Sequence, residues 1–266
     1  ERPMNAPLRH ESAGAGEPAI VLLHPIAMRL EFWRPVAERL SGKQRVISLD
    51  LRGHGRNPPT KTGYSIGDLA SDVVALCRSQ DVRTACFIGC SLGGMVAQGV
   101  TLLAPELVSS LVLANTTHRM SPQGAEVMRG RAEASAKGLE NTIDQDIARW
   151  FSEPFRKAHP ETVETVRGWA LENDPMTVAH GWLAIAALNY ESRLHAVKQP
   201  VLVTTGSLDQ ASPPEAARQT AAAFANGRYI EIPDCGHFSP IERPDTFARI
   251  IEEFLATREG AGQAER

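Results

Sequence analysis

One serine stands between two glycines, directly after an apolar run, in Gly89-Cys90-Ser91-Leu92-Gly93. Residues 85–88 are expected to form a buried strand, and residues 92–104 a helix. So sharp a strand-to-helix turn needs small neighbours, because bulky side chains would collide with the adjacent backbone. The turn lifts the serine hydroxyl above the sheet and aims the helix N-terminus at a reacting carbon. The pattern predicts that Ser91 is a nucleophile.

Short apolar runs alternate with amphipathic stretches along most of the chain. Most of the runs are continuous, which is typical of parallel strands that are covered on both faces. The expected strands are residues 19–23, 45–49, 85–88, 110–114, 201–205 and 228–232. The expected helices between them are at about 30–40, 65–80, 92–104, 213–225 and 241–256. This alternation predicts an α/β fold with a doubly wound, mostly parallel sheet.

The segment 119–194 breaks this alternation, since it contains no convincing strand. Helices are expected there at about 122–138, 141–152, 160–172 and 175–189, with Pro154, Pro160 and Pro175 at positions typical of helix starts. We interpret it as a helical cap inserted over the strand ends, the alternative being another layer of the core. The predicted domains are a core of residues 1–118 and 195–266 and a cap of residues 119–194.

A serine hydroxyl is a weak nucleophile at neutral pH, so it needs a base and a third group that orients the base. His237 follows the last expected strand, and Asp209 follows the strand before it. Both loops therefore lie at the carboxyl edge of the sheet, where open α/β folds bind ligands. Ser91, Asp209 and His237 are the predicted catalytic residues.

An oxyanion hole is the remaining requirement of this chemistry. The backbone N–H of Leu92 is one expected donor, because it follows the nucleophile. The second is expected from the loop after residues 19–23, where Pro25 has no N–H and Ile26 is the first available donor. His24 in the same loop is an alternative base, but we expect it to brace the loop.

Several motifs together resemble the α/β-hydrolase superfamily over nearly the whole chain. They are His24-Pro25, Asp50-Leu51-Arg52-Gly53-His54-Gly55, the turn at Ser91, Gly206-Ser207-Leu208-Asp209 and Gly236-His237. Within the superfamily the chain resembles the 3-oxoadipate enol-lactonase group. The segments that carry this second resemblance are Gly89-Cys90-Ser91-Leu92-Gly93-Gly94-Met95, Leu113-Ala114-Asn115-Thr116-Thr117 and Arg149-Trp150-Phe151. The order serine, aspartate, histidine is also that of the superfamily.

This resemblance implies two substrate-binding residues in the cap. Arg149 would point into the cleft and pair with a substrate carboxylate, and Trp150 would form an apolar wall. A surface arginine and a core tryptophan are the alternative. Pro25 stands where the superfamily usually has glycine. The lactonases generally lack a His-Gly or His-Pro pair at this place. Residues 7–12 are expected to form one edge strand, with no room for the additional first strand common in the family.

Composition and charge exclude several function classes. The net charge of −3 gives no reason to expect nucleic acid or an anionic membrane surface as a partner. Apolar stretches such as residues 19–23 are far too short to span a bilayer. No grouping of residues has metal-ligand spacing, and no phosphate-binding glycine motif stands at a strand end. We therefore expect no metal and no cofactor.

Four cysteines occur without a CxxC pair, at positions 77, 86, 90 and 235. We interpret them as reduced thiols of a cytoplasmic protein, the alternative being a secreted protein with disulfides. Cys90 is adjacent to Ser91 and could itself be a nucleophile, but buried packing is the expected role.

The predicted function is a serine hydrolase of a small carboxylic ester or lactone, with a small molecule as its only expected partner. C–C bond hydrolysis of a vinylogous diketone and cofactor-free perhydrolysis are alternatives on the same three residues. A ligand-binding receptor that kept the fold and lost turnover is the alternative from another class. The sequence does not indicate an oligomeric state.

Overall fold

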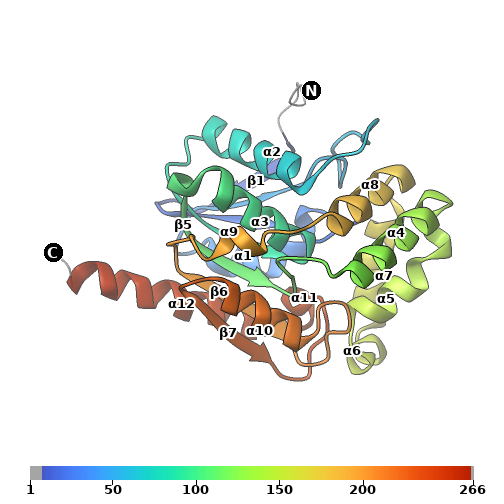
Figure 1. The fold of residues 1–266 in the computed structure, drawn as a ribbon. Coiled ribbons are helices and arrows are strands. Elements are labelled where there is room, and N and C mark those ends of the chain that lie inside the picture. The colour runs from blue at the N-terminus through green and yellow to red at the C-terminus, as the bar shows by residue number, and fades with distance from the viewer. Residues whose placement is uncertain (1–7, 265–266) are drawn as a thin grey trace.

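A seven-stranded sheet forms the centre of the computed structural model, which describes residues 8–264, with side chains up to residue 257 (Figure 1). The strand order is β1-β3-β2-β4-β5-β6-β7, and only β1 runs antiparallel to its neighbour. The strands are β1 (His10–Ala13), β2 (Ala19–Leu23), β3 (Val46–Leu49), β4 (Ala85–Cys90), β5 (Val108–Ala114), β6 (Val201–Gly206) and β7 (Gly227–Ile232). The doubly wound, mostly parallel sheet predicted from the sequence is confirmed.

The interior strands are buried, apart from the half-buried Ser109 in β5, as the continuous apolar runs require. Every residue of β2, β4 and β6 is buried. The edge strand β1 pairs with β3, His10 lying opposite Leu49. It overlaps the expected edge segment 7–12 at residues 10–12 and continues to Ala13, and residue 7 lies outside the described part.

Helices cover both faces of the sheet. The chain moves one way in the sheet from β2 to β3 and the opposite way from β3 to β4, so right-handed crossovers place α1 and α2 on opposite faces. Accordingly α1 packs against α12, and α2 against α3. The core helices are η1 (Leu30–Trp33), α1 (Arg34–Leu40), α2 (Ile66–Ser79), α3 (Leu92–Leu103), η2 (Pro105–Leu107), α10 (Pro214–Ala223), α11 (Ser239–Glu242) and α12 (Pro244–Ala264).

The chain between β5 and β6 is helical, and α4 to α8 gather at one end of the molecule (Figure 1). Its helices are α4 (Pro122–Ala136), η3 (Leu139–Asn141), α5 (Ile143–Trp150), α6 (Glu153–Ala158), α7 (Pro160–Leu171), α8 (Pro175–Ala186) and α9 (Glu191–Leu194). Prolines stand in the first turn of α6, α7 and α8, as expected.

The helix expected at 141–152 is too long by two residues at each end, since α5 spans Ile143–Trp150. It ends at Trp150 because Phe151 is extended and the Ser152 side chain caps α6, accepting a hydrogen bond from the N–H of Phe155.

Candidate functional site

Ser91 occupies a strained turn between β4 and α3. Its φ of 52° and ψ of −116° are unfavourable for a residue with a side chain, so surrounding contacts must hold it. Its N–H donates to the carbonyl of Ala114 at 2.9 Å. Its carbonyl accepts from the hydroxyl of Thr116 at 2.7 Å. The end of β5 thus fixes the turn on both sides of the serine.

The glycines around Ser91 allow this close packing. A Cβ at Gly93 would collide with the carbonyl of Leu23 at the end of β2. A Cβ at Gly89 would collide with the carbonyl of Gly93. Small neighbours are therefore required here, as the sequence indicated, because α3 begins directly against two strand ends.

Asp209 and His237 form a buried hydrogen-bonded pair on the loops after β6 and β7. The Nδ1 atom of His237 lies 2.9 Å and 3.0 Å from the two carboxylate oxygens of Asp209. A carboxylate accepts hydrogen bonds, so Nδ1 carries the proton and the lone pair of the neutral ring lies on Nε2. The pair therefore has the orientation of a base and the group that orients it.

Asp209 is held in its charged form. Burial would raise its pKa, but His237 and several donors favour the carboxylate and keep the pKa below its ordinary value. The N–H groups of Ala211 and Ser212 donate to Oδ1 at 2.8 Å and 2.9 Å. The amide of Asn115 donates to Oδ2 at 2.9 Å.

A small cavity of about 40 Å³ brings most of the predicted site residues together. Ser91 and His237 both line it, although no hydrogen bond joins them within the described residues. The complete lining is Ile26, Ser91, Met95, Met120, Met128, Arg131, Arg149, Trp150, Trp182, Ile185, Ala211, Ser212 and His237. Its residues come from the sheet edge and from the helices between β5 and β6. That helical segment therefore covers the carboxyl ends of the strands.

The two expected oxyanion donors are backbone N–H groups near Ser91. Leu92 is the first residue of α3, so its N–H has no acceptor within the helix. Ile26 lies in the loop after β2 and lines the cavity. Within residues 8–264, neither N–H has an acceptor outside the regular elements. Both donors are therefore available to a ligand.

His24 braces the loop that carries Ile26. Its Nδ1 donates to the carbonyl of Pro25 at 2.7 Å, and its Nε2 accepts from the N–H of Leu51 at 2.9 Å. Burial lowers its pKa, so the ring stays neutral in this arrangement. With both nitrogens occupied, His24 has no free lone pair for proton transfer, in agreement with the expected bracing role.

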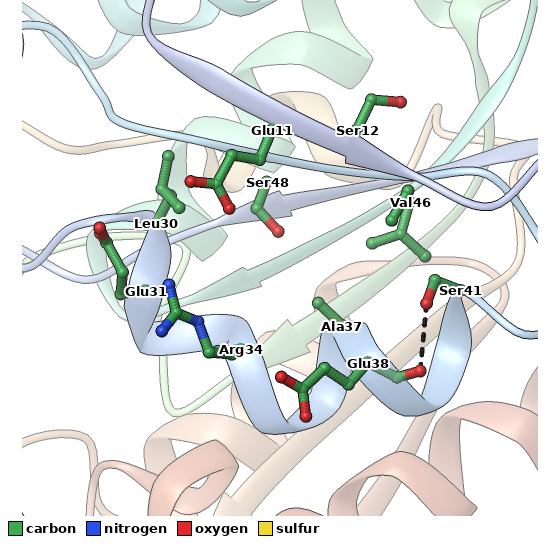
Figure 2. A pocket seen from close by; sticks show the side chains of 11 residues that line it. Glu11, Ser12, Leu30, Glu31, Arg34, Ala37, Glu38, Ser41, Val46 and Ser48 are labelled. Carbon is green, nitrogen blue, oxygen red and sulfur yellow. Dashed lines mark hydrogen bonds between the residues drawn. The ribbon is translucent and has the colours of Figure 1, made fainter.

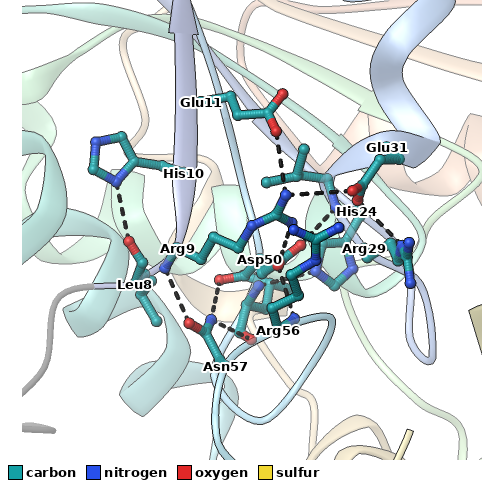
Figure 3. A network of polar contacts seen from close by, with 12 residues as sticks. Leu8, Arg9, His10, Glu11, His24, Arg29, Glu31, Asp50, Arg56 and Asn57 are labelled. Atoms are coloured by element: carbon teal, nitrogen blue, oxygen red, sulfur yellow. Dashed lines mark hydrogen bonds and ion pairs between the residues drawn. The ribbon is translucent and has the colours of Figure 1, made fainter. Parts of the chain in front are cut away.

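Asp50 and its partners form a polar network next to His24 (Figure 3). The wholly buried carboxylate of Asp50 accepts from the N–H of Leu30 at 2.7 Å and from Arg9 at 3.0 Å. Asn57 donates to the carbonyl of Asp50 at 2.7 Å. These contacts give Asp50 a structural role.

Two arginines in the cavity wall differ in their partners. Arg131 pairs with the buried Asp146 and lies over the ring of Trp182, 4.8 Å from its centre. Arg149 is half-buried and has no ion pair or hydrogen bond to another described residue. Burial and the nearby Arg131 lower the pKa of Arg149, yet a guanidinium stays charged in proteins. The cavity wall therefore contains one uncompensated positive charge.

Trp150 joins the helical segment to the histidine loop. Its ring stacks on Phe238 with the centroids 5.0 Å apart, and its carbonyl accepts from the N–H of Phe238 at 2.9 Å. Two residues later, the N–H and hydroxyl of Ser152 each donate to the buried carboxylate of Glu242 at 2.8 Å. The wall of the cavity and His237 are thus held in one packed unit.

Cys90 is a buried thiol rather than a second nucleophile. Its sulfur points to the carbonyl of His237 at 3.8 Å. Burial raises its pKa well above the ordinary value, so the reactive thiolate is disfavoured. Cys77, Cys86 and Cys235 are likewise buried, and none of the four cysteines forms a disulfide.

A larger pocket of about 400 Å³ lies between β1 and α1 (Figure 2), and it shares no lining residue with the cavity at Ser91. Glu11, Glu31, Glu38 and Arg34 line it. Glu31 already pairs with Arg9 and Arg29 outside it. Size alone therefore does not locate the candidate chemistry in this molecule.

Residues 8–257 contain no group of three or more histidine, cysteine, aspartate or glutamate side chains that could hold a metal ion. Among the helices described, none combines the length and the apolar character needed to cross a membrane.

Comparisons with known proteins point to one family. A model of the alpha/beta hydrolase fold matches residues 18–244. The 3-oxoadipate enol-lactonase 2 of Acinetobacter baylyi is 26% identical over 91% of this chain and 90% of its own length. A malate-bound thermophilic esterase from Thermogutta terrifontis superposes with a TM-score of 0.88 at 29% identity, over 94% of this chain and 93% of the esterase. The enol-lactonase from Burkholderia xenovorans superposes with a TM-score of 0.87 at 29% identity, over 94% of this chain and 96% of the enol-lactonase.

Proposed function

The chain belongs to the α/β-hydrolase fold family, and on that premise we propose that it hydrolyses a small carboxylic ester or lactone through an acyl intermediate on Ser91. One observation carries the proposal. The hydrogen-bonded Asp209–His237 pair and the strained Ser91 come from three separate loops, and the histidine and serine line one cavity.

In the proposed mechanism, His237 Nε2 takes the proton of the Ser91 hydroxyl as the oxygen attacks the substrate carbonyl. The N–H groups of Leu92 and Ile26 stabilise the oxyanion of the tetrahedral intermediate, and His237 then protonates the leaving oxygen. Water, activated by the same histidine, releases the acid and restores the serine. Asp209 stabilises the imidazolium throughout.

We further propose that the substrate carries a carboxylate that pairs with Arg149, beside an apolar wall formed by Trp150. The uncompensated charge of Arg149 supports this, because an arginine fork binds a carboxylate with two parallel hydrogen bonds. The names of the relatives agree: two are enol-lactonases, and the esterase was solved with malate bound. A cavity of about 40 Å³ favours a small acyl group.

Covalent labelling tests the nucleophile. A fluorophosphonate should label the parent protein with a stoichiometry of one, and Ser91→Ala should abolish both labelling and ester hydrolysis. Cys90→Ala is the matched control, because it changes the adjacent residue and should still label. A parent protein that resists labelling would instead favour the non-catalytic receptor.

A substrate panel tests the reaction and the role of Arg149. A p-nitrophenyl ester, an enol-lactone with a carboxylate and a vinylogous diketone should be compared, with peroxide added in a separate series. Arg149→Met should raise KM for the carboxylated lactone by about 10- to 100-fold and leave the neutral ester within about twofold. Arg129→Met, an exposed arginine on α4, is the control. A preference for the diketone would identify C–C bond hydrolysis as the activity, and a preference for peroxide would identify perhydrolysis.

A further inference from the structure

Asn115 lies immediately after β5, at the carboxyl edge of the sheet, and is wholly buried. Its φ of 50° falls in the left-handed region, which asparagine tolerates better than most residues. Its N–H donates to the carbonyl of Thr204 in β6 at 2.8 Å. The backbone therefore fixes the side chain between the loops that follow β6 and β7.

The side-chain amide contacts both of those loops. Its Nδ2 donates to Asp209 Oδ2 at 2.9 Å and to the carbonyl of Gly236 at 3.2 Å. Its Oδ1 accepts from the hydroxyl of Ser239 at 2.6 Å. The opposite amide orientation would set an oxygen against a carboxylate and a carbonyl, so the hydrogen-bond network permits only this one.

Resting on the function proposed above, we propose that Asn115 is a positioning residue that holds the Asp209 carboxylate in line with His237. Gly236 and Ser239 flank His237 in the sequence, so one amide links the acid to both sides of the histidine. It acts through Asp209 and does not line the cavity.

The hydrogen bonds of Asp209 show why the amide matters. His237 contacts both oxygens, but Oδ1 is also held by two backbone N–H groups, whereas the other donors to Oδ2 are side chains: Asn115 and, at 3.2 Å, the hydroxyl of Thr205. Without the Asn115 donor, Oδ2 could rotate out of line with the imidazole. A donor to the carboxylate also favours its charged form.

Two variants test the proposal. Asn115→Gly suits the positive φ and removes the side chain, so the fold should persist while kcat falls about 5- to 10-fold and KM stays within twofold. Asn115→Asp keeps the shape and the contact with Ser239 but turns an acceptor toward Asp209. Its kcat should fall by about 30-fold or more. The added negative charge should also favour the imidazolium and move the acid limb of the kcat/KM profile to higher pH.

Rates are expressed per site labelled by the fluorophosphonate. The matched control is Asn226→Asp, which lies directly before β7, at the end of the strand opposite to His237, and should have the parent pH profile. The downfield proton resonance of His237 Nδ1 gives a readout that needs no turnover and should shift in both Asn115 variants. Folded variants with the parent kcat per site, pH profile and resonance would overturn the proposal while leaving the ester hydrolase intact. A shifted resonance in a protein that does not label would support the positioning role and reject the hydrolase.

Discussion

Two buried histidines lie at the carboxyl edge of the sheet, on the loops after β2 and β7, and their environments differ in one respect. Both nitrogens of His24 are used by backbone groups. His237 Nδ1 donates to the carboxylate of Asp209, and His237 lines the same cavity as Ser91. Burial alone does not separate them, since both are nearly inaccessible to solvent.

The difference teaches that the partners of an imidazole, rather than its depth, decide what it can do. Backbone partners on both sides make His24 part of the loop architecture. A carboxylate on one side of His237 stabilises the charge that a proton would bring. The loop after β2 is therefore a fixed support, and the loops after β6 and β7 carry the proposed proton transfer.

The largest expected effect comes from breaking the His237 side of this comparison. Asp209→Asn should lower kcat by about 10³–10⁴-fold, because the amide no longer holds the correct tautomer or stabilises the imidazolium. Thermal unfolding should remain close to that of the parent. Steady-state kinetics on a p-nitrophenyl ester checks this. A variant whose kcat is within tenfold of the parent value would reject the proposed role of Asp209.

The next effect comes from the His24 side, and it should appear chiefly in stability. His24→Ala leaves the buried N–H of Leu51 without an acceptor and creates a cavity, so unfolding in urea should cost about 2–4 kcal/mol less. The fall in kcat should be only about tenfold, through loosening of the Ile26 donor. His195→Ala, which is exposed, is the control. A stable His24→Ala protein with a rate as low as that of Asp209→Asn would reverse the two roles.

The pH dependence of stability should report the buried histidines of the bracing side, with a further contribution of the same sign from His118, whose pKa is also lowered by burial. Burial lowers the pKa of His54, beside His24, to about 3, and lowers that of His24 as well. The unfolded chain, with histidine pKa values near 6.5, then binds more protons, so stability is lost as pH falls from about 6.5 toward 3.

The slope should approach about 1.4 kcal/mol per pH unit for each such histidine. Urea unfolding at a series of pH values between 6.5 and 4.5 measures it. His54→Leu should have a shallower slope than the parent, whatever its absolute stability. Equal slopes would show that His54 is not the group responsible.

The smallest effect is expected at Pro25. Pro25→Gly should lower the unfolding free energy by about 0.4–1 kcal/mol, because the unfolded chain gains freedom. The Pro25 carbonyl, which accepts from His24 and Met28, is retained, so kcat should change less than twofold. A large loss of rate would mean that the proline ring itself positions Ile26.

The core of the fold was predictable because buried parallel strands leave continuous apolar runs. All six such runs form strands, with boundaries displaced by at most two residues. The inserted helices were predictable mainly from their prolines. Pro154 marked a helix start in α6, but the helix itself was not among those expected, because its boundary depends on the Ser152 side chain and the sequence before it is compatible with a longer α5.

The candidate site was predictable where a residue follows its own strand, as Ser91, Asp209 and His237 do. Asn115 also follows a strand, but a single asparagine at such a place has no chemical signature. Its position at the same sheet edge was the available signal. The contact of Ser152 with Glu242 joins residues 90 positions apart, and no local pattern in a single sequence reports such a pairing.

The stacking of Trp150 on Phe238, next to the Ser152–Glu242 contact, has a consequence for engineering. Exchanging the helical segment between two relatives would remove these contacts and loosen the loop that carries His237, even if Ser91, Asp209 and His237 were all kept. A working chimera should therefore take residues 150–152 and residues 238–242, which form the two sides of this contact, from the same parent. Under the proposed function, the wall that would select the substrate and the histidine that would move its proton belong to one packed unit.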